Sequence, residues 1–321
     1  MTDTTRLLPP DGPGLAEAAR LLSHGALVAF PTETVYGLGG DARNPRAVAA
    51  IYAAKGRPAK NPLIVHVADL AAARSFAAFP PEAERLADAF WPGPLTLVLP
   101  LNPDAGLAPA VTAGLPSVAI RVPEHKVARA LLTAFDGPLA APSANPSGKI
   151  SPTAPGHVMA GLAGRIAAVV DAGPCAVGLE STILDLSDGP ARLLRPGGLP
   201  AEAIAECLGH QPDTAAADPD RPSAPGQLAS HYAPEAALRL NAGRPRAGEV
   251  WIGFGPDCEG AAFTLSPSGD MAEAASVLYA TLRDADAAAG PGGRIAIAPI
   301  PGHGLGRAIN DRLARAAAPR P

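Results

Sequence analysis

The sequence predicts an α/β protein built from two domains. Short apolar runs of strand length alternate with segments of helical period, and many of the runs open into polar loops. The chain has 321 residues, which suggests about two domains. Between residues 209 and 234 Pro, Asp and Ala dominate and no periodicity persists. We therefore expect a first domain over 1–209, a linker over 210–234 and a smaller domain over 235–321.

Strands and helices are expected to alternate along the first domain. Strands are predicted at 26–30, 63–67, within 91–100, at 117–125, at the start of 138–153, and at 167–173, 181–187 and 191–198. Helices are predicted at 14–23, 44–55, 69–77, 81–90, 124–134, after 153, and at 200–208. Asn44 and Thr153 are expected to cap the helices that follow them. Residues 31–42, rich in glycine, are expected to form a loop of turns.

The residues after the linker predict a small Rossmann-like α/β unit. Strands are expected at 237–241, 249–255 and 294–300, with helices at 271–289 and 304–317. Because the strands alternate with helices, we expect a parallel sheet.

Composition narrows the classes of function. The chain carries 26 basic and 30 acidic residues, a net charge of −4, so any contact with a polyanion must come from a local patch. The three cysteines form no CxxC pair, which argues against a zinc site or a disulfide framework and fits a reducing cytoplasm. The N-terminus lacks an apolar signal segment, and no stretch approaches the roughly 20 apolar residues of a membrane span. We expect a cytoplasmic protein without a membrane contact.

A cationic loop is the most distinctive stretch of the chain. KGRPAKNPLIVHV, residues 55–67, holds two of only four lysines and leads into a short apolar strand. A basic loop at the mouth of a buried strand is suited to holding an anion, although a lone basic loop is more often a solvated surface feature.

Polar side chains from several strand ends point to one shared pocket. Three arginines and a lysine, with several hydroxyl groups and glycines, suit a ligand that carries phosphates and a carboxylate. The sequence has no GxxxxGK[ST] loop and no GxGxxG fingerprint, so the predicted nucleotide site is of neither type. His66 is a candidate base or, more commonly for a strand histidine, a positioning residue. Glu33 and Glu180 are candidates for an acid/base pair or for structural roles.

Seven spaced motifs in residues 14–208 resemble the threonylcarbamoyl-AMP synthase family and its YrdC-like catalytic domain. They are PTETVYGLG (31–39), KGRPAKNPL (55–63), WPGPLTLVL (91–99), AIRVP (119–123), APSANPSG (141–148), GLESTILDL (178–186) and LLRPG (193–197). SAPGQLASHYAP (223–234), followed by an α/β unit, resembles the longer two-domain form of these enzymes.

The resemblance implies a fold and a reaction. The fold would be a YrdC-like twisted mixed sheet with helices and a concave pocket. The reaction would convert L-threonine, bicarbonate or CO₂, and ATP into L-threonylcarbamoyl-AMP and pyrophosphate. A downstream threonylcarbamoyl transferase complex would use this product to modify tRNA next to the anticodon. Mg²⁺ would accompany ATP, and no protein metal site is expected.

The same resemblance implies the site residues. The threonine subsite would comprise Thr34, His66, Arg121, Ala141 and Ser181, with Ala141 contributing only backbone. The ATP subsite would comprise Lys55, Arg57, Asn61, Ser117, Ser143, Ser151, Arg195 and Tyr232. Lys55, Arg57 and Arg121 would carry the chemistry, since fixed cations stabilise charge that builds on phosphoryl oxygens.

Two other functions fit parts of the pattern. A non-enzymatic RNA-binding module would use a concave basic sheet, but the acidic net charge argues against it, and binding of an RNA backbone would not require the hydroxyl groups or His66. Weak RNA binding is therefore expected at most as an addition to the enzyme activity. Carbamoyl transfer in metallocentre maturation is disfavoured because zinc-finger cysteines and an acylphosphatase-like segment are missing.

The linker carries an unusual pair of aromatic side chains, His231 and Tyr232. Proline-rich linkers are usually inert spacers, whereas a tyrosine suits a lid over a nucleotide. We expect residues 223–234 to fold back over the pocket of the first domain.

Overall fold

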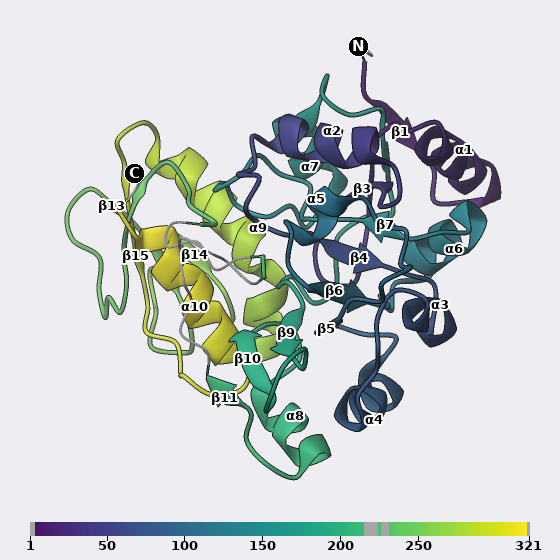
Figure 1. Ribbon diagram of the computed structural model, residues 1–321. Coiled ribbons are helices and arrows are strands. Elements are labelled where there is room, and N and C mark those ends of the chain that lie inside the picture. Colours follow the sequence, from purple (N-terminus) through teal and green to yellow (C-terminus); the bar gives the residue numbers. More distant parts are fainter. Residues whose placement is uncertain (1–3, 215–223, 226–230, 320–321) are drawn as a thin grey trace.

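The computed structural model describes residues 4–214, 224–225 and 231–319 (Figure 1). The strands of the first domain are β1 (Arg6–Leu8), β2 (Val28–Phe30), β3 (Gly37–Asp41), β4 (Ile64–His66), β5 (Leu95–Pro100), β6 (Ser117–Arg121), β7 (Leu139–Ala140), β8 (Ala168–Val170), β9 (Thr182–Asp185), β10 (Arg192–Arg195) and β11 (Asp213–Thr214). Its helices are α1 (Gly12–Ser23), α2 (Pro45–Lys55), α3 (Leu70–Arg74), α4 (Pro81–Phe90), α5 (Pro109–Thr112), α6 (Lys126–Phe135), α7 (Pro155–Leu162) and α8 (Ala201–Leu208).

These strands form one mixed sheet in the order β1-β8-β2-β3-β7-β4-β6-β5-β9-β10-β11. Strands β4 and β6 run parallel to each other, and so do β5 and β9. Strand β7 is antiparallel to β4, and β5 is antiparallel to β6. The predicted mixed α/β sheet is confirmed. The last strand, β11, lies inside the segment that we expected to be linker.

Both faces of this sheet are buried. Along β2, Val28 and Phe30 belong to one hydrophobic cluster and Ala29 to another, because successive strand side chains point to opposite faces. Helices α1 and α6 pack beside each other over the Val28 face, where Leu22 and Leu131 are fully buried.

Of the two predicted N-terminal caps, Asn44 is confirmed and Thr153 is not. Asn44 caps α2 through its side-chain oxygen, with Pro45 at the first helical position, and the helix ends at Gly56 in the left-handed conformation. The expectation that Thr153 caps α7 is wrong. Ala154 occupies that position, and the Thr153 amide donates to Nδ1 of His157 instead.

The prediction of a loop of turns over 31–42 is wrong for its second half, which forms a strand. Residues 37–41 form β3, which pairs with β2 and β7. A Cβ at Gly39 would lie 2.9 Å from Cε1 of Phe30, and one at Gly40 would lie 3.1 Å from Cδ1 of Ile51. This strand therefore needs glycine because bulky neighbours cover it closely.

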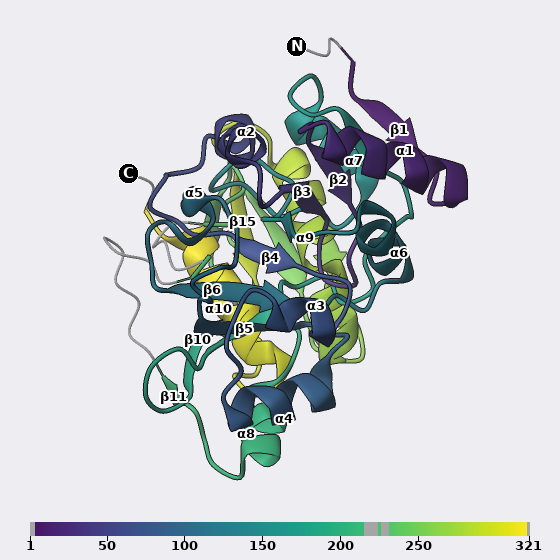
Figure 2. The same ribbon diagram turned by 45° about the vertical axis from the view of Figure 1, so that its right-hand side comes forward.

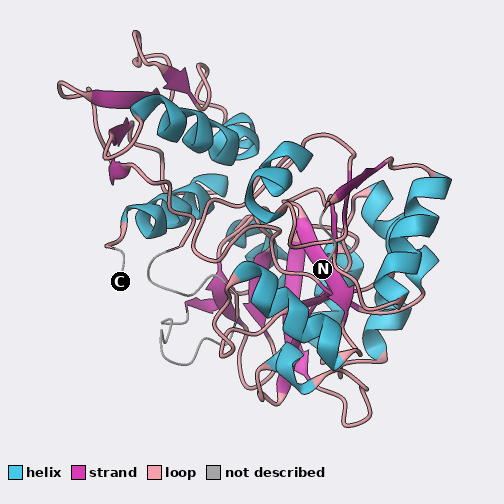
Figure 3. Ribbon diagram, turned by 90° about the horizontal axis from the view of Figure 1, so that it is seen from above, coloured by secondary structure: helices cyan, strands magenta, loops and turns pink. Residues whose placement is uncertain are grey.

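The second domain contains β12 (Ala237–Arg239), β13 (Glu249–Gly253), β14 (Phe263–Thr264), β15 (Arg294–Ile297), α9 (Met271–Ala289) and α10 (Leu305–Ala317). Its sheet has the order β12-β15-β13-β14, and every pair is parallel, as predicted. Figure 2 shows the first sheet from another side, and Figure 3 shows the smaller domain lying to one side of the larger one.

The two domains share a hydrophobic core. Val35, Ile150 and Leu179 of the first domain cluster with Leu278 and Ile309 of the second. Helices α9 and α10 therefore form the face of the second domain that meets the loops of the first domain. Within the described ranges, no helix has the length and apolarity needed to cross a membrane.

Candidate active site

A small cavity lies where the strand ends of the first domain converge. Its volume is about 50 Å³, and its walls come from loops after β2 and β7, from strand ends and from two parts of the expected linker. The lining residues are Thr32, Thr34, Val35, Gly37, Arg57, Ile64, His66, Arg121, Ala141, Pro142, Ser143, Glu180, Ser181, Arg195, Pro225, His231 and Tyr232.

Nine of the predicted site residues line this cavity: Thr34, Arg57, His66, Arg121, Ala141, Ser143, Ser181, Arg195 and Tyr232. The sheet register explains part of the convergence, since His66 and Arg121 pair at the ends of the parallel strands β4 and β6. Four other predicted residues, Lys55, Asn61, Ser117 and Ser151, are not among the lining residues.

Arg121 is buried and held in a fixed orientation. Its Nε donates to the carbonyl of Gly93 at 3.2 Å, and Nη1 donates to Oγ1 of Thr34 at 2.9 Å. Nη2 pairs with Oε1 of Glu33 at 2.5 Å, and the same carboxylate accepts the amide of Glu124. Glu33 is thus the counter-ion that fixes the orientation of Arg121. This contact favours the structural role of Glu33 over a role as acid or base.

His66 lies beside Arg121 and is 3% exposed. Burial, followed by the charge of Arg121, lowers its pKa from 6.5 to about 3. Its Nδ1 faces the carbonyl of Ile64, and its ring meets the ring of Phe30 edge-on. A histidine that stays neutral at physiological pH in this setting acts by position rather than as a strong base.

The cationic loop contributes in two ways. Lys55 is buried, and its Nζ donates to the carbonyls of Ser143 and Asn145. It therefore ties the end of α2 to the loop after β7, and burial, with the charge of Arg57, keeps its pKa well below the usual value. Arg57 reaches the cavity while its Nε and Nη2 donate to the carbonyls of Asn61 and Pro62.

The remaining predicted polar residues occupy distinct places. Asn61 is fully buried, and within the described part of the chain neither its side-chain oxygen nor its nitrogen has a hydrogen-bond partner. Ser117 opens β6 opposite Pro100, away from the cavity lining. Ser151 stands behind the lining and donates to Oε1 of Glu180 at 2.6 Å.

Arg195, at the end of β10, links the first domain to the linker. Its Nη2 donates to the carbonyl of Ser181 at 2.8 Å, and its Nη1 donates to the carbonyl of Pro225 at 3.3 Å. The hydroxyl of Ser181 is also bonded to Thr96. The residues of the expected linker that line the cavity are Pro225, His231 and Tyr232, whereas 223 and 226–230 lie outside the described residues.

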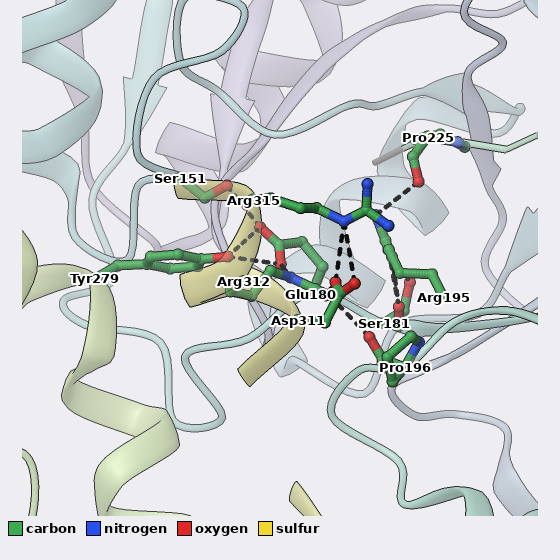
Figure 4. A network of polar contacts seen from close by, with 10 residues as sticks. All are labelled: Ser151, Glu180, Ser181, Arg195, Pro196, Pro225, Tyr279, Asp311, Arg312 and Arg315. Carbon is green, nitrogen blue, oxygen red and sulfur yellow. Dashed lines mark hydrogen bonds and ion pairs between the residues drawn. The ribbon is translucent and has the colours of Figure 1, made fainter. Parts of the chain in front are cut away.

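The structure adds residues that sequence reasoning missed, and they surround Glu180 (Figure 4). Tyr279 of α9 donates to this carboxylate, and Arg312 of α10 pairs with Oε2 at 2.8 Å. Burial would raise the pKa of Glu180, but the charges of Arg312 and Arg195 and two hydrogen bonds lower it to about 2. No spacing in the sequence distinguishes Arg312 from the other arginines of its helix, because only the docking of the domains buries it.

Comparison with known proteins assigns both domains. A model of the Sua5, YciO and YrdC proteins, described as telomere recombination, matches residues 20–197. A model described as the C-terminal domain of threonylcarbamoyl-AMP synthase matches residues 199–318. The chain belongs to the threonylcarbamoyl-AMP synthase family. The predicted resemblance is therefore confirmed over both halves of the chain.

Family members with this name are similar over much of their length. The threonylcarbamoyl-AMP synthase of Bacillus subtilis is 50% identical over 246 residues, which cover 76% of this chain and 71% of that protein. The protein of the same name from Pyrococcus abyssi is 48% identical over 225 residues, which cover 69% and 66%. The crystal structure of P. abyssi Sua5 complexed with L-threonine has a TM-score of 0.88 at 37% identity, covering 98% of this chain and 97% of that one.

Proposed function

We propose that this chain forms L-threonylcarbamoyl-AMP and pyrophosphate from L-threonine, bicarbonate or CO₂, and ATP. The observation that carries this proposal is the convergence of three buried arginines, Arg57, Arg121 and Arg195, on one cavity that also holds Ser, Thr and His side chains. Such a set suits a small carboxylate and a polyphosphate in adjacent places. The names of the B. subtilis and P. abyssi relatives support the same reaction.

The threonine subsite lies around Arg121 in this proposal. Its guanidinium would bind the carboxylate of threonine, while His66 and Thr34 set the shape and polarity of the wall beside it. Ala141 would contribute backbone and Ser181 a hydroxyl. The binding of L-threonine by P. abyssi Sua5, which has the same fold, supports this choice of amino acid.

ATP would lie on the side of Arg57 and Arg195, with Ser143 at the wall. Asn61 supports this placement, because a buried amide without a partner in the described residues is costly until a ligand bonds to it. Lys55 would act by holding the 143–145 loop, and Ser151 by holding Glu180. Ser117 stays a sequence-based prediction. Mg²⁺ would enter on the phosphates of ATP.

The chemistry needs charge stabilisation and exclusion of water. The amine of threonine would attack CO₂, which bicarbonate supplies by losing water on protonation, and would release a proton to give a carbamate. The carbamate oxygen would then attack the α-phosphorus as pyrophosphate leaves. Fixed guanidinium groups would stabilise the charge that develops on the phosphoryl oxygens. The product would then feed a transferase that modifies tRNA next to the anticodon, in a cytoplasmic setting.

The linker acts as a lid in this proposal. Pockets for drug-sized ligands usually offer roughly 300–1,000 Å³, and the cavity of about 50 Å³ is far smaller. ATP therefore requires Pro225, His231 and Tyr232 to move outward before it enters. Closure of the same segment over the bound nucleotide would shield a hydrolysable mixed anhydride from water.

Pyrophosphate release tests the assignment. The purified chain, incubated with ATP, should release pyrophosphate only when both threonine and bicarbonate are present. A transferase or a chemical trap that removes the labile product should increase the yield. Cleavage of ATP that ignores threonine would reject the proposal.

A further inference from the structure

Arg312 is a fully buried arginine on α10, in the domain that does not carry the predicted catalytic residues. Its Nε donates to Glu180, its Nη2 donates to the carbonyl of Pro196, and its Nη1 pairs with Asp311 (Figure 4). Its guanidinium carbon also lies 5.1 Å from the centre of the Tyr232 ring. One side chain of the second domain thus contacts a wall of the cavity and the lid.

Burying an ion pair is an expensive way to join two domains. The desolvation of both charges often exceeds their attraction, and apolar residues of similar volume commonly serve as well or better. This interface already has an apolar core in which Val35, Ile150 and Leu179 meet the second domain. Docking therefore does not explain why an arginine stands at position 312.

The charge of Glu180 supplies a reason. Among the described residues that line the cavity, Glu180 is the one carboxylate, and it lies there with Arg57 and Arg195. A polyphosphate in this cavity would meet a negative charge beside its cationic ligands. Tyr279 and Ser151 donate hydrogen bonds to Glu180, but only Arg312 brings a full positive charge from the second domain.

The same side chains support the lid. The ring of Tyr232 lies against the ring of Tyr279, with centroids 5.8 Å apart and an interplanar angle of 26°. Arg312 lies over the ring of Tyr232, where a cation–π contact is favourable in a dry setting. The second domain therefore provides a fixed seat for Tyr232 and a counter-charge for Glu180 at one point.

We propose that Arg312 is a positioning residue with which the second domain prepares the cavity for a polyphosphate, by neutralising Glu180 and seating Tyr232. This inference rests on the proposed function for the identity of the ligand. It gives the second domain an indirect part in nucleotide binding, through the residues Glu180 and Tyr232 that line the cavity.

Calorimetric titration of the full chain with a non-hydrolysable ATP analogue, and separately with L-threonine, tests this role. Arg312→Met should weaken binding of the analogue by at least about ten-fold, because Glu180 is left uncompensated, while threonine binding stays within about two-fold. Glu180→Gln should bind the analogue as tightly as the unmodified chain or more tightly. The double variant Arg312→Met with Glu180→Gln should recover most of the lost affinity.

Arg307→Met is the matched control. Arg307 lies on the same helix and pairs with Glu202 of the first domain at 3.0 Å, but this pair is exposed and neither residue lines the cavity. Its replacement should leave both affinities unchanged.

The signs of these changes separate the proposal from a purely structural role. If Arg312→Met and Glu180→Gln weaken both ligands alike, or if the double variant binds as poorly as Arg312→Met, the proposal is overturned. If Arg312→Met does not fold, as judged by melting, the double variant decides, and it must bind the analogue within about three-fold of the unmodified chain. These titrations need no turnover, so their failure is distinct from a failure of the synthase assignment.

Discussion

At the scale of single residues, each arginine of the cavity is held by specific partners before any ligand arrives. Contacts with Glu33 and Thr34 orient the guanidinium of Arg121, and the carbonyl of Ser181 orients that of Arg195. Such prior orientation lowers the cost of ordering a cation around a ligand or a transition state.

Replacing Arg57 and Arg121 by alanine should produce different defects. Arg57→Ala should weaken ATP binding and Arg121→Ala should weaken threonine binding, each by about ten- to a hundred-fold, the loss of one charge-assisted contact. Because Arg121→Ala also leaves Glu33 buried without its partner, its melting temperature should be the lower of the two. Calorimetry in which both variants keep normal affinity for both ligands would refute this map.

The buried histidines should make stability depend on pH. The pKa of His66 falls from 6.5 to about 3 on folding, and that of His231 falls to about 3, in both cases mainly through burial. Between about pH 3 and 6.5 the unfolded chain binds protons that the folded chain does not, so stability is complete above this window and falls on acidification. Each histidine should contribute a slope of up to about 1.4 kcal/mol per pH unit.

Denaturant unfolding at pH 7, 6 and 5 measures this dependence. His66→Gln should reduce the slope, and the part that remains should come from His231 and from the half-buried His125 and His157, whose pKa values burial also lowers. An unchanged slope in the variant would show that His66 binds protons equally in the folded and the unfolded chain.

Most of the cavity was predictable at this scale, because polar residues directly before or after apolar runs mark strand ends. Thr34, His66, Arg121, Ser143, Ser181 and Arg195 all lie near such places and line the cavity. Glu180 was considered only as an acid or a structural residue, and Arg312 was missed. Their partnership joins residues 132 positions apart in sequence, which no local pattern encodes.

At the scale of elements, Gly178 fixes how closely α9 approaches the first domain. Its φ is +75°, and a Cβ there would lie 2.3 Å from the carbonyl oxygen of Ala275. Both features require glycine, the first through backbone strain and the second through direct overlap with a helix backbone.

Gly178→Ala should therefore loosen the domain interface and lower the melting temperature. Gly189→Ala is the matched control, since Gly189 has a φ of +74° but no atom within 4 Å of the added Cβ. Backbone strain at Gly189 should cost about 1 kcal/mol, and the substitution at Gly178 should cost clearly more. Equal losses in the two variants would contradict close contact between α9 and the first domain.

The lid should control how fast nucleotide enters and leaves. Tyr232 is 1% exposed and lines the cavity, so Tyr232→Ala should raise both the association and the dissociation rates of an ATP analogue in stopped-flow experiments. Net affinity should fall because closure is lost. Burial of this ring predicts a loss of roughly 3 kcal/mol of stability on truncation to alanine. If Tyr232→Ala leaves both rates unchanged, residues 223–234 are a spacer between the domains and not a lid.

Element prediction failed where packing overrides composition. Glycine-rich residues 37–41 resemble a loop in composition, yet they form a strand that pairs with β2 and β7. Their glycines are explained by Phe30 and Ile51, which leave little room for larger side chains. The short strands β1, β11 and β14 were missed because two or three residues carry no measurable period.

At the scale of the whole molecule, the two domains share one apolar cluster and one buried polar network. Residues of the first domain, including Val35 and Leu179, pack into the core of the second. Division into a larger and a smaller α/β unit was predictable from the change in composition around the linker. The contacts that α9 and α10 make with Glu180 and Tyr232 at the cavity wall were not predictable, because docking depends on surface shape and not on the pattern of either segment.

The most direct test of the central claim is transfer of labelled carbon into an adenylate. The full chain should convert ATP, L-threonine and ¹³C-bicarbonate into a nucleotide whose mass, by mass spectrometry, contains AMP, threonine and one labelled carbon, with pyrophosphate as the other product. Omission of threonine should abolish both products. Pyrophosphate released without threonine, or an adenylate that carries no label, would contradict the account.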